Sequence, residues 1–150
     1  MIVVLFFMVL MHIIEDFHLQ GIMGNMKTKS WWDELFQNVY AKTDNPEQAK
    51  WVKEYQKKAK FDYVPVLLLH GFEWSMFIHM PVLAVYWFTQ GVVLFDSTFM
   101  YVLCAVIIIQ GLIHSMVDDI KANGLGISLV TDQSIHLIQI LVSYLILVGF

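Results

Sequence analysis

The chain has 150 residues, of which 58% are apolar and 15% charged, whereas a soluble domain usually has about a quarter charged residues. All nine cationic side chains are lysines and the formal net charge is −4, which excludes a strongly basic nucleic-acid-binding surface. The single cysteine, Cys104, excludes an internal disulfide and a thiolate zinc site. The composition therefore predicts a small integral membrane protein.

Four segments are apolar enough to cross a bilayer, which takes about 20 residues as a helix. They cover about residues 1–23, 63–89, 92–115 and 128–150. The first lacks the basic leading region and the small-residue cleavage site of a secretory signal peptide, so we expect it in the mature protein. The predicted fold class is an all-α polytopic membrane protein, a single membrane domain over residues 1–150 built as a bundle of four transmembrane helices.

The connection between the first two spans, residues 24–62, is polar and has an amphipathic pattern. The run WWDELFQNVYA places Trp31, Leu35 and Val39 at helical spacing, and Asn45-Pro46 is typical of a break between two short helices. Aromatic and lysine-rich helices beside membrane spans commonly lie along the lipid headgroups. We therefore expect an amphipathic cytoplasmic helical hairpin, with a partner-binding or lid role as the alternative.

The lysines are distributed unevenly. Eight lie in residues 24–62, and the ninth, Lys121, lies in the connection between the third and fourth predicted spans. Lysine-rich loops stay cytoplasmic, so both termini are predicted to be non-cytoplasmic in a bacterial inner membrane. The lipid bilayer is the predicted partner and no nucleic acid is expected. A homo-oligomer and a cytoplasmic partner bound through residues 24–62 are left open.

Ionisable and amide residues follow one helical face of each span, at the end nearer the lysine-rich connections. Residues three or four apart share a face of a helix. A charge inside a bilayer is costly and normally faces the interior of a bundle. We therefore expect the four stripes to converge in the cytoplasmic half of the membrane. In chain order they are His12, Asp16 and Gln20; His70 and Glu73; His114, Asp118 and Lys121; and Asp132, His136 and Gln139.

Carboxylates outnumber cations in this layer. Five of them, with Glu15 beside the first stripe, face the single lysine Lys121. A divalent metal would offset their repulsion, and mixed imidazole and carboxylate ligands suit zinc, manganese or iron. A polar network that only fixes helix packing is the alternative. The predicted metal ligands are His12, Asp16, His70, His114, Asp118, Asp132 and His136.

The stripes belong to longer motifs, which are HIIEDFHLQ from His12, HGFEW from His70, HSMVDDIK from His114 and TDQSIH from Thr131. In combination they resemble the DUF3307 family of bacterial and phage membrane proteins, and the resemblance spans nearly all of the chain except residues 24–62. It supplies no activity. A more distant similarity to membrane-bound metal-dependent hydrolases of prophages implies hydrolysis. The matching positions are His12, Asp16, Gln20, His70, His114, Asp118, Lys121, Asp132, Gln133 and His136.

The predicted function is metal-dependent hydrolysis at the membrane, on a phosphorylated or lipid-linked substrate. The metal would activate a water molecule, with Glu73 as the general base. Lys121 and Gln20 would bind an anionic substrate oxygen. The alternative is a non-enzymatic membrane protein, either an ion or proton conduit, a phage envelope factor or a scaffold, in which the same polar cluster has a structural role.

Overall fold

A computed structural model describes residues 2–90, 98–124 and 126–149, and within these ranges the chain is helical, with no strand. This confirms the predicted all-α class. The elements are α1 (Ile2–Ile14), the π-helix η1 (Glu15–Leu19), α2 (Met23–Met26), α3 (Lys29–Ala41), α4 (Pro46–Lys58), the 3-10 turn η2 (Ala59–Phe61), α5 (Tyr63–Gln90), α6 (Thr98–Asn123) and α7 (Leu129–Val148).

Four helical stretches are long and apolar enough to span a membrane, as predicted. They lie within Ile2–Leu19, Pro46–Thr89, Thr98–Asn123 and Leu129–Val148. Large apolar side chains are exposed along them, among them Phe6, Leu69, Met76, Ile109 and Leu145. Exposed apolar residues in this number are what a lipid-facing surface requires, so the structure is consistent with an integral membrane protein.

The helix α6 continues past the predicted third span, which covered residues 92–115. It ends at Asn123, while residues 92–97 lie outside the described part of the chain. The predicted span stopped at residue 115 because polar residues follow it. The helix continues through them because Ser115 and Asp118 are buried in the bundle. Lys121 therefore lies on the last turn of α6 and not in a connection, which corrects its predicted position.

The first span changes its helical geometry before it ends. After Ile14, five residues form the π-helix η1, in which each turn holds more residues than an α-helix. Gly21 follows with a φ of +47°, a left-handed conformation that glycine adopts at low cost. The chain turns there into the short helix α2, which leads to α3.

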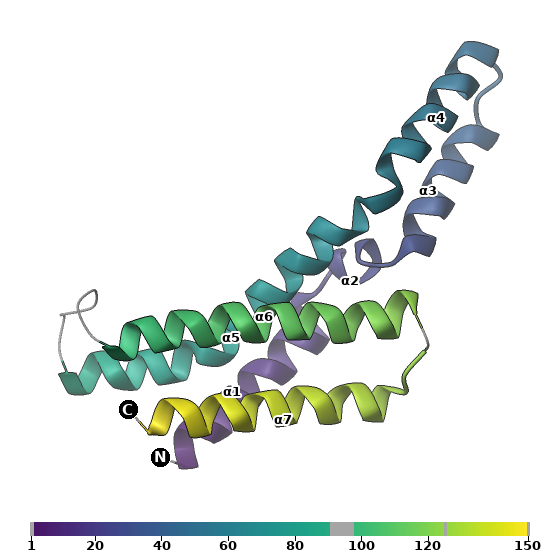
Figure 1. Cartoon of the computed structure of the whole chain (residues 1–150). Helices are drawn as coiled ribbons and strands as arrows, with labels where there is room; N and C mark the ends of the chain where they lie inside the picture. The colour runs from purple at the N-terminus through teal and green to yellow at the C-terminus, as the bar shows by residue number, and fades with distance from the viewer. Residues whose placement is uncertain (1, 91–97, 125, 150) are drawn as a thin grey trace.

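The helices α3 and α4 form a pair that extends away from the bundle (Figure 1). The predicted break lies between them, where the Asn45 side chain caps α4 by accepting from the backbone N–H of Glu47 at 2.9 Å. Phe36, Val52 and Ala59 form the buried core of the α3–α4 pair. The second helix leads through η2 into α5 with only Asp62 between them, so helix is almost continuous from Pro46 to Gln90.

Close packing of α5 against α6 organises the bundle. A Cβ atom on Gly71 would lie 2.5 Å from the backbone oxygen of Gly111, so the two helices approach where neither has a side chain. The helix α1 packs on α5 and α7 through a core of Met8, Trp74, Ile78 and Ile140. The α6–α7 connection and the segment α2–α4 lie at one end of the bundle, and the chain termini lie at the other (Figure 1).

Candidate metal centre

The four predicted stripes meet inside the bundle. Their histidines and carboxylates come from the end of the first span, the start of α5, the end of α6 and the start of α7. Residues that distant in sequence share one buried layer because α5 and α6, and then α6 and α7, run in opposite directions (Figure 1). The members that are 2% exposed or less are His12, Glu15, His70, His114, Asp118, Asp132 and His136.

His136 faces the carboxylates of Asp118 and Asp132. His136 Nε2 lies 3.5 Å from Asp118 Oδ1 and 3.3 Å from Asp132 Oδ1. When a metal lies about 2.1 Å from each of its ligands at tetrahedral angles, neighbouring ligand atoms are about 3.4 Å apart. His136 Nε2 and Asp132 Oδ1 are buried and have no hydrogen-bond partner among the described residues. Within the described ranges, Asp132 does not belong to a set in which all donor atoms lie within 4.8 Å of one another, whereas His136 and Asp118 form such a set with His114, and these three residues could hold a metal ion.

His136 Nδ1 lies 3.0 Å from Gln139 Oε1 and 3.2 Å from His114 Nδ1, and the contact with Gln139 favours a proton on Nδ1 and a lone pair on Nε2 in the neutral ring. Gln139 donates from Nε2 to the backbone oxygen of Gln110 at 3.2 Å and to its Oε1 at 2.9 Å. The Oε1 of Gln139 is then the acceptor for Nδ1–H of His136 at 3.0 Å. Nε2 consequently faces two carboxylate oxygens, and a cation is needed there, either a metal ion or a proton on the ring.

A second group adjoins the first. His70 Nε2 lies 3.3 Å from His114 Nε2, 3.3 Å from Asp118 Oδ2 and 3.8 Å from Asp16 Oδ1. Asp118 therefore lies between the two groups, with one oxygen toward each. The donor atoms of Asp16, His70 and His114, and those of His114, Asp118 and His136, lie within 4.8 Å of one another in each set. These buried groups can hold a metal ion.

Glu15 contacts the outer nitrogen of His70. Its Oε1 lies 3.1 Å from His70 Nδ1, and the carboxylate is 0% exposed. A carboxylate on the far nitrogen of a histidine fixes the ring and increases its basicity toward a metal. Glu15 was expected only beside the stripe. The π-helix η1 begins at this residue, and its wider turn accompanies the contact of Glu15 and the neighbouring Asp16 with the same ring.

His12 uses both of its ring nitrogens in hydrogen bonds. Trp74 donates from Nε1 to His12 Nδ1 at 2.8 Å, so Nε2 carries the proton of the neutral ring and donates to Gln133 Oε1 at 3.0 Å. Gln133 in turn donates to Asp16 Oδ2 at 2.9 Å and to Asp132 Oδ2 at 3.1 Å. In this arrangement His12 orients two carboxylates of the cluster through Gln133.

Two lysines pair with carboxylates of the cluster. Lys27 Nζ lies 2.5 Å from Asp118 Oδ2, and Lys121 Nζ lies 2.5 Å from Asp132 Oδ2. Lys121 alone was predicted as a cation of this layer, and Lys27 is a second one. Four buried carboxylates, including Glu15, and two lysines leave two negative charges when the histidines are neutral. One divalent cation would balance them.

A cavity of about 390 Å³ lies beside the cluster. Gln20, one of the predicted substrate-binding residues, lines it and donates to Asp16 Oδ1 at 2.9 Å. Glu73, the predicted general base, is half-buried and takes part in no hydrogen bond or ion pair within the described ranges. The polar residues that line the cavity are Asp16, Gln20, Lys27, Thr28, Asp118, Lys121 and Gln133.

Sequence reasoning missed Lys27 and undervalued Trp74. Trp74 stacks on the ring of His114 with centroids 4.1 Å apart, in addition to its bond to His12. Its position directly after Glu73 in the HGFEW motif was a signal for this role. Lys27 had no such signal, because it reaches Asp118 only through the turn at Gly21.

No family model, curated protein or solved structure matches this chain. The resemblance to the DUF3307 family therefore stays a prediction.

Proposed function

We propose that this protein is a membrane hydrolase that uses a divalent metal held by the His/Asp cluster, and that its substrate is phosphorylated or lipid-linked. The observation that carries the proposal is that donor atoms of His114, Asp118 and His136 lie within 4.8 Å of one another inside the bundle. All three side chains are 2% exposed or less, and their free lone pairs need a cation.

The cavity beside the cluster supplies the groups that an anionic substrate requires. Lys27, in the turn directly after α2, and Lys121, on the last turn of α6, line it, and Gln20 adds an amide. A phosphate group bound there would pair with the lysines in place of the carboxylates that they now contact. The metal would supply the Lewis acidity that activates water as a nucleophile. Glu73 would act as the base only if a side-chain rotation brought it toward the cavity.

The proposal includes the side of the membrane that each end of the bundle faces. The cavity is lined by residues after α1, from the end of α6 and from the start of α7, including Lys121. The lysine-rich segment α2–α4 lies at the same end of the bundle (Figure 1). Lysine-rich segments favour the cytoplasmic side, so the site would open toward the cytoplasm of a bacterium and the termini would face away from it. The α3–α4 pair would then lie in the headgroup region or beyond it.

A second function, a polar network with a purely structural role, is favoured by the two lysine pairs. Lys27 and Lys121 already compensate Asp118 and Asp132, and protonation of two histidines would balance the rest. A conduit for ions is less favoured. Toward the end of the bundle with the termini, the interior holds the buried apolar cluster of Phe99, Leu103, Val106 and Leu147, with His79 and Ser143 as polar side chains buried beyond the His/Asp cluster in the described part of the chain.

Metal content distinguishes the two functions. The full chain, purified in detergent, is stripped with a chelator, reloaded separately with zinc, manganese or iron, and analysed for bound metal. We expect at least one ion per chain in the wild type and a loss of about tenfold or more in affinity for Asp118→Asn and His136→Ala. Release of phosphate from a chromogenic phosphate ester and from a short-chain prenyl diphosphate is measured on the same samples.

Two control variants match these substitutions. Asp119→Asn changes the neighbouring carboxylate, which contacts Asn123 and not the cluster, and His18→Ala changes an exposed histidine. Both should bind metal as the wild type does. A folded wild-type protein that takes up no metal under any of the three conditions would exclude the metal site and support the structural network. Metal binding without phosphate release from either substrate would exclude the proposed reaction but not the site.

A further inference from the structure

A second cavity, of about 720 Å³, lies between α3, α4, η2 and the start of α5. It shares no lining residue with the cavity of the metal centre. Four of its lining residues are lysines, and one, Asp33, carries a carboxylate. The Asp33 carboxylate accepts a hydrogen bond from Gln56 Nε2 at 3.4 Å. The lysines are Lys29, Lys53, Lys57 and Lys60. The cavity therefore carries an excess of positive charge in a chain whose net charge is −4.

The rest of the cavity wall is aromatic. Trp32, Phe36, Phe61 and Tyr63 line it together with the lysines. The ammonium of Lys29 lies 5.0 Å from the centre of the Tyr63 ring, within range of a cation–π contact. Cationic side chains above aromatic and apolar surface match a ligand with an anionic end and an apolar end.

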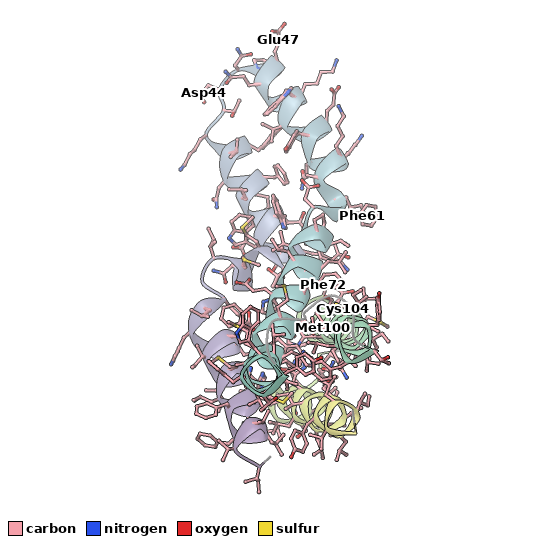
Figure 2. All side chains as sticks on the ribbon, turned by 90° about the vertical axis from the view of Figure 1, so that its left-hand side faces the viewer. Asp44, Glu47, Phe61, Phe72, Met100 and Cys104 are labelled. Atoms are coloured by element: carbon pink, nitrogen blue, oxygen red, sulfur yellow. The ribbon has the colours of Figure 1, made fainter. Side chains whose placement is uncertain are left out.

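The position of the cavity indicates where such a ligand comes from. Tyr63 is the first residue of α5, so the cavity lies at the point where the second apolar span begins. Figure 2 shows Phe61 near the base of the α3–α4 pair, where the pair joins the bundle, and Asp44 and Glu47 at its far tip. Phe61 is 63% exposed, as expected for an aromatic side chain that reaches the headgroup layer.

We propose that this cavity binds the phosphate headgroup of an anionic phospholipid of the surrounding bilayer. The phosphate would lie among the four lysines, and the glycerol and the first part of the acyl chains would lie against Phe61 and Tyr63. Lys53, Lys57 and Lys60 are spaced by four and three, so they lie on one side of α4 and η2 and can contact one headgroup together. Such a lipid would fix the α3–α4 pair to the membrane.

The test compares two triple variants of the full chain by native mass spectrometry in detergent. Dioctanoyl phosphatidylglycerol and dioctanoyl phosphatidylcholine are titrated separately. Lys53→Gln, Lys57→Gln and Lys60→Gln together remove the net positive charge of the cavity, because the remaining Lys29 is balanced by Asp33. Lys42→Gln, Lys50→Gln and Lys58→Gln remove the same charge from exposed lysines of the α3–α4 pair outside the cavity. Circular dichroism and elution volume confirm that each variant is folded.

We expect the wild type to bind phosphatidylglycerol about tenfold more tightly than phosphatidylcholine, given the contribution of each lysine near an anionic lipid. The cavity variant should lose this preference and the control variant should keep it. Equal losses in both variants, or no preference in the wild type, would overturn the proposal. Displacement of the lipid by an equal concentration of inorganic phosphate would assign the cavity to free phosphate, and binding of an acidic peptide but not of lipid would assign it to a protein partner. Both results would also overturn the proposal.

Discussion

The close approach of α5 and α6 at Gly71 allows a strong test of how the metal centre is built. Substitution of Gly71 by alanine would place a Cβ atom 2.1 Å from Ser115 Oγ and 2.5 Å from the backbone oxygen of Gly111. The serine hydroxyl can rotate away, but it would give up its bonds to the backbone oxygens of Leu67 and Gly111, at 3.1 and 2.9 Å. The backbone oxygen cannot rotate, so α5 and α6 must separate.

The cost can be worked from these contacts. Overpacking of a close-packed interior costs about 1–3 kcal/mol, and loss of the buried serine bonds adds about 1 kcal/mol. We expect Gly71→Ala to lower the free energy of unfolding by about 2–4 kcal/mol, and each kcal/mol corresponds to about 2–4 °C in Tm for a chain of this size. Metal affinity should fall as well, because Gly71 follows His70 and the separation moves His70 away from His114 and Asp118.

The assay is thermal unfolding in detergent, followed by circular dichroism, with metal content measured on the same sample. Gly149→Ala is the control, because the nearest atom to its added Cβ would lie at an ordinary 3.4 Å. Combining Gly71→Ala with Ser115→Ala should recover only part of the lost stability, since the oxygen of Gly111 stays in place. A Gly71→Ala protein with the Tm and the metal content of the wild type would refute this account of the helix contact.

Three further substitutions probe residues around the metal. Trp74→Phe removes the N–H that His12 accepts and should cost about 1–3 kcal/mol of stability, measured by thermal unfolding. Lys27→Met removes the ammonium that competes with a metal for Asp118, so metal affinity, measured by chelator competition, should rise while KM for a phosphate ester also rises. Glu15→Gln should weaken metal affinity by about 10–100-fold in the same competition assay, because the carboxylate orients a ligand histidine.

Each of these three substitutions has a matched control substitution elsewhere in the chain. Trp51→Phe, Lys42→Met and Glu34→Gln alter exposed side chains of the α3–α4 pair and should leave stability, metal affinity and KM unchanged. Equal destabilisation by Trp74→Phe and Trp51→Phe would mean that the bond to His12 contributes nothing. Weaker metal binding in Lys27→Met would show that the lysine supports the site instead of competing for it. Unchanged affinity in Glu15→Gln would remove Glu15 from the metal centre.

Local patterns were sufficient to predict most of the fold. The apolar runs identified four long helices, and Asn45-Pro46 identified the start of α4, because a capping side chain and a proline at the first turn act within a few residues. The spacing of four on three of the spans grouped the histidines and aspartates, because helical periodicity alone determines which residues share a face. On α5 the pair His70 and Glu73, three apart, was predicted together, but only His70 belongs to the cluster. The antiparallel order of α5, α6 and α7 then brought the groups to one layer.

Contacts that depend on turns and on tertiary packing could not be predicted in the same way. Lys27 reaches Asp118 only because Gly21 adopts a left-handed conformation and redirects the chain. The hydrogen bonds of His12 were equally hidden, since they join Trp74 and Gln133 from two other helices. The extent of α6 was underestimated because hydropathy alone does not show that a carboxylate such as Asp118 is buried against other polar groups.

The π-helix η1 gives the first helix the character of a one-residue insertion. Its wide turn accommodates an additional residue without breaking the helix. Deleting Phe17, which is 54% exposed and belongs to η1, would return the segment to ordinary helical winding. Five residues in the wide turn cover about the same rotation as four in an α-helix, so Gln20 and Lys27 would keep their orientation. Glu15 and Asp16 would then lie about 100° apart on the helix and could no longer both contact His70, so a single-codon deletion would test whether the chemistry of the bundle depends on the wide turn itself.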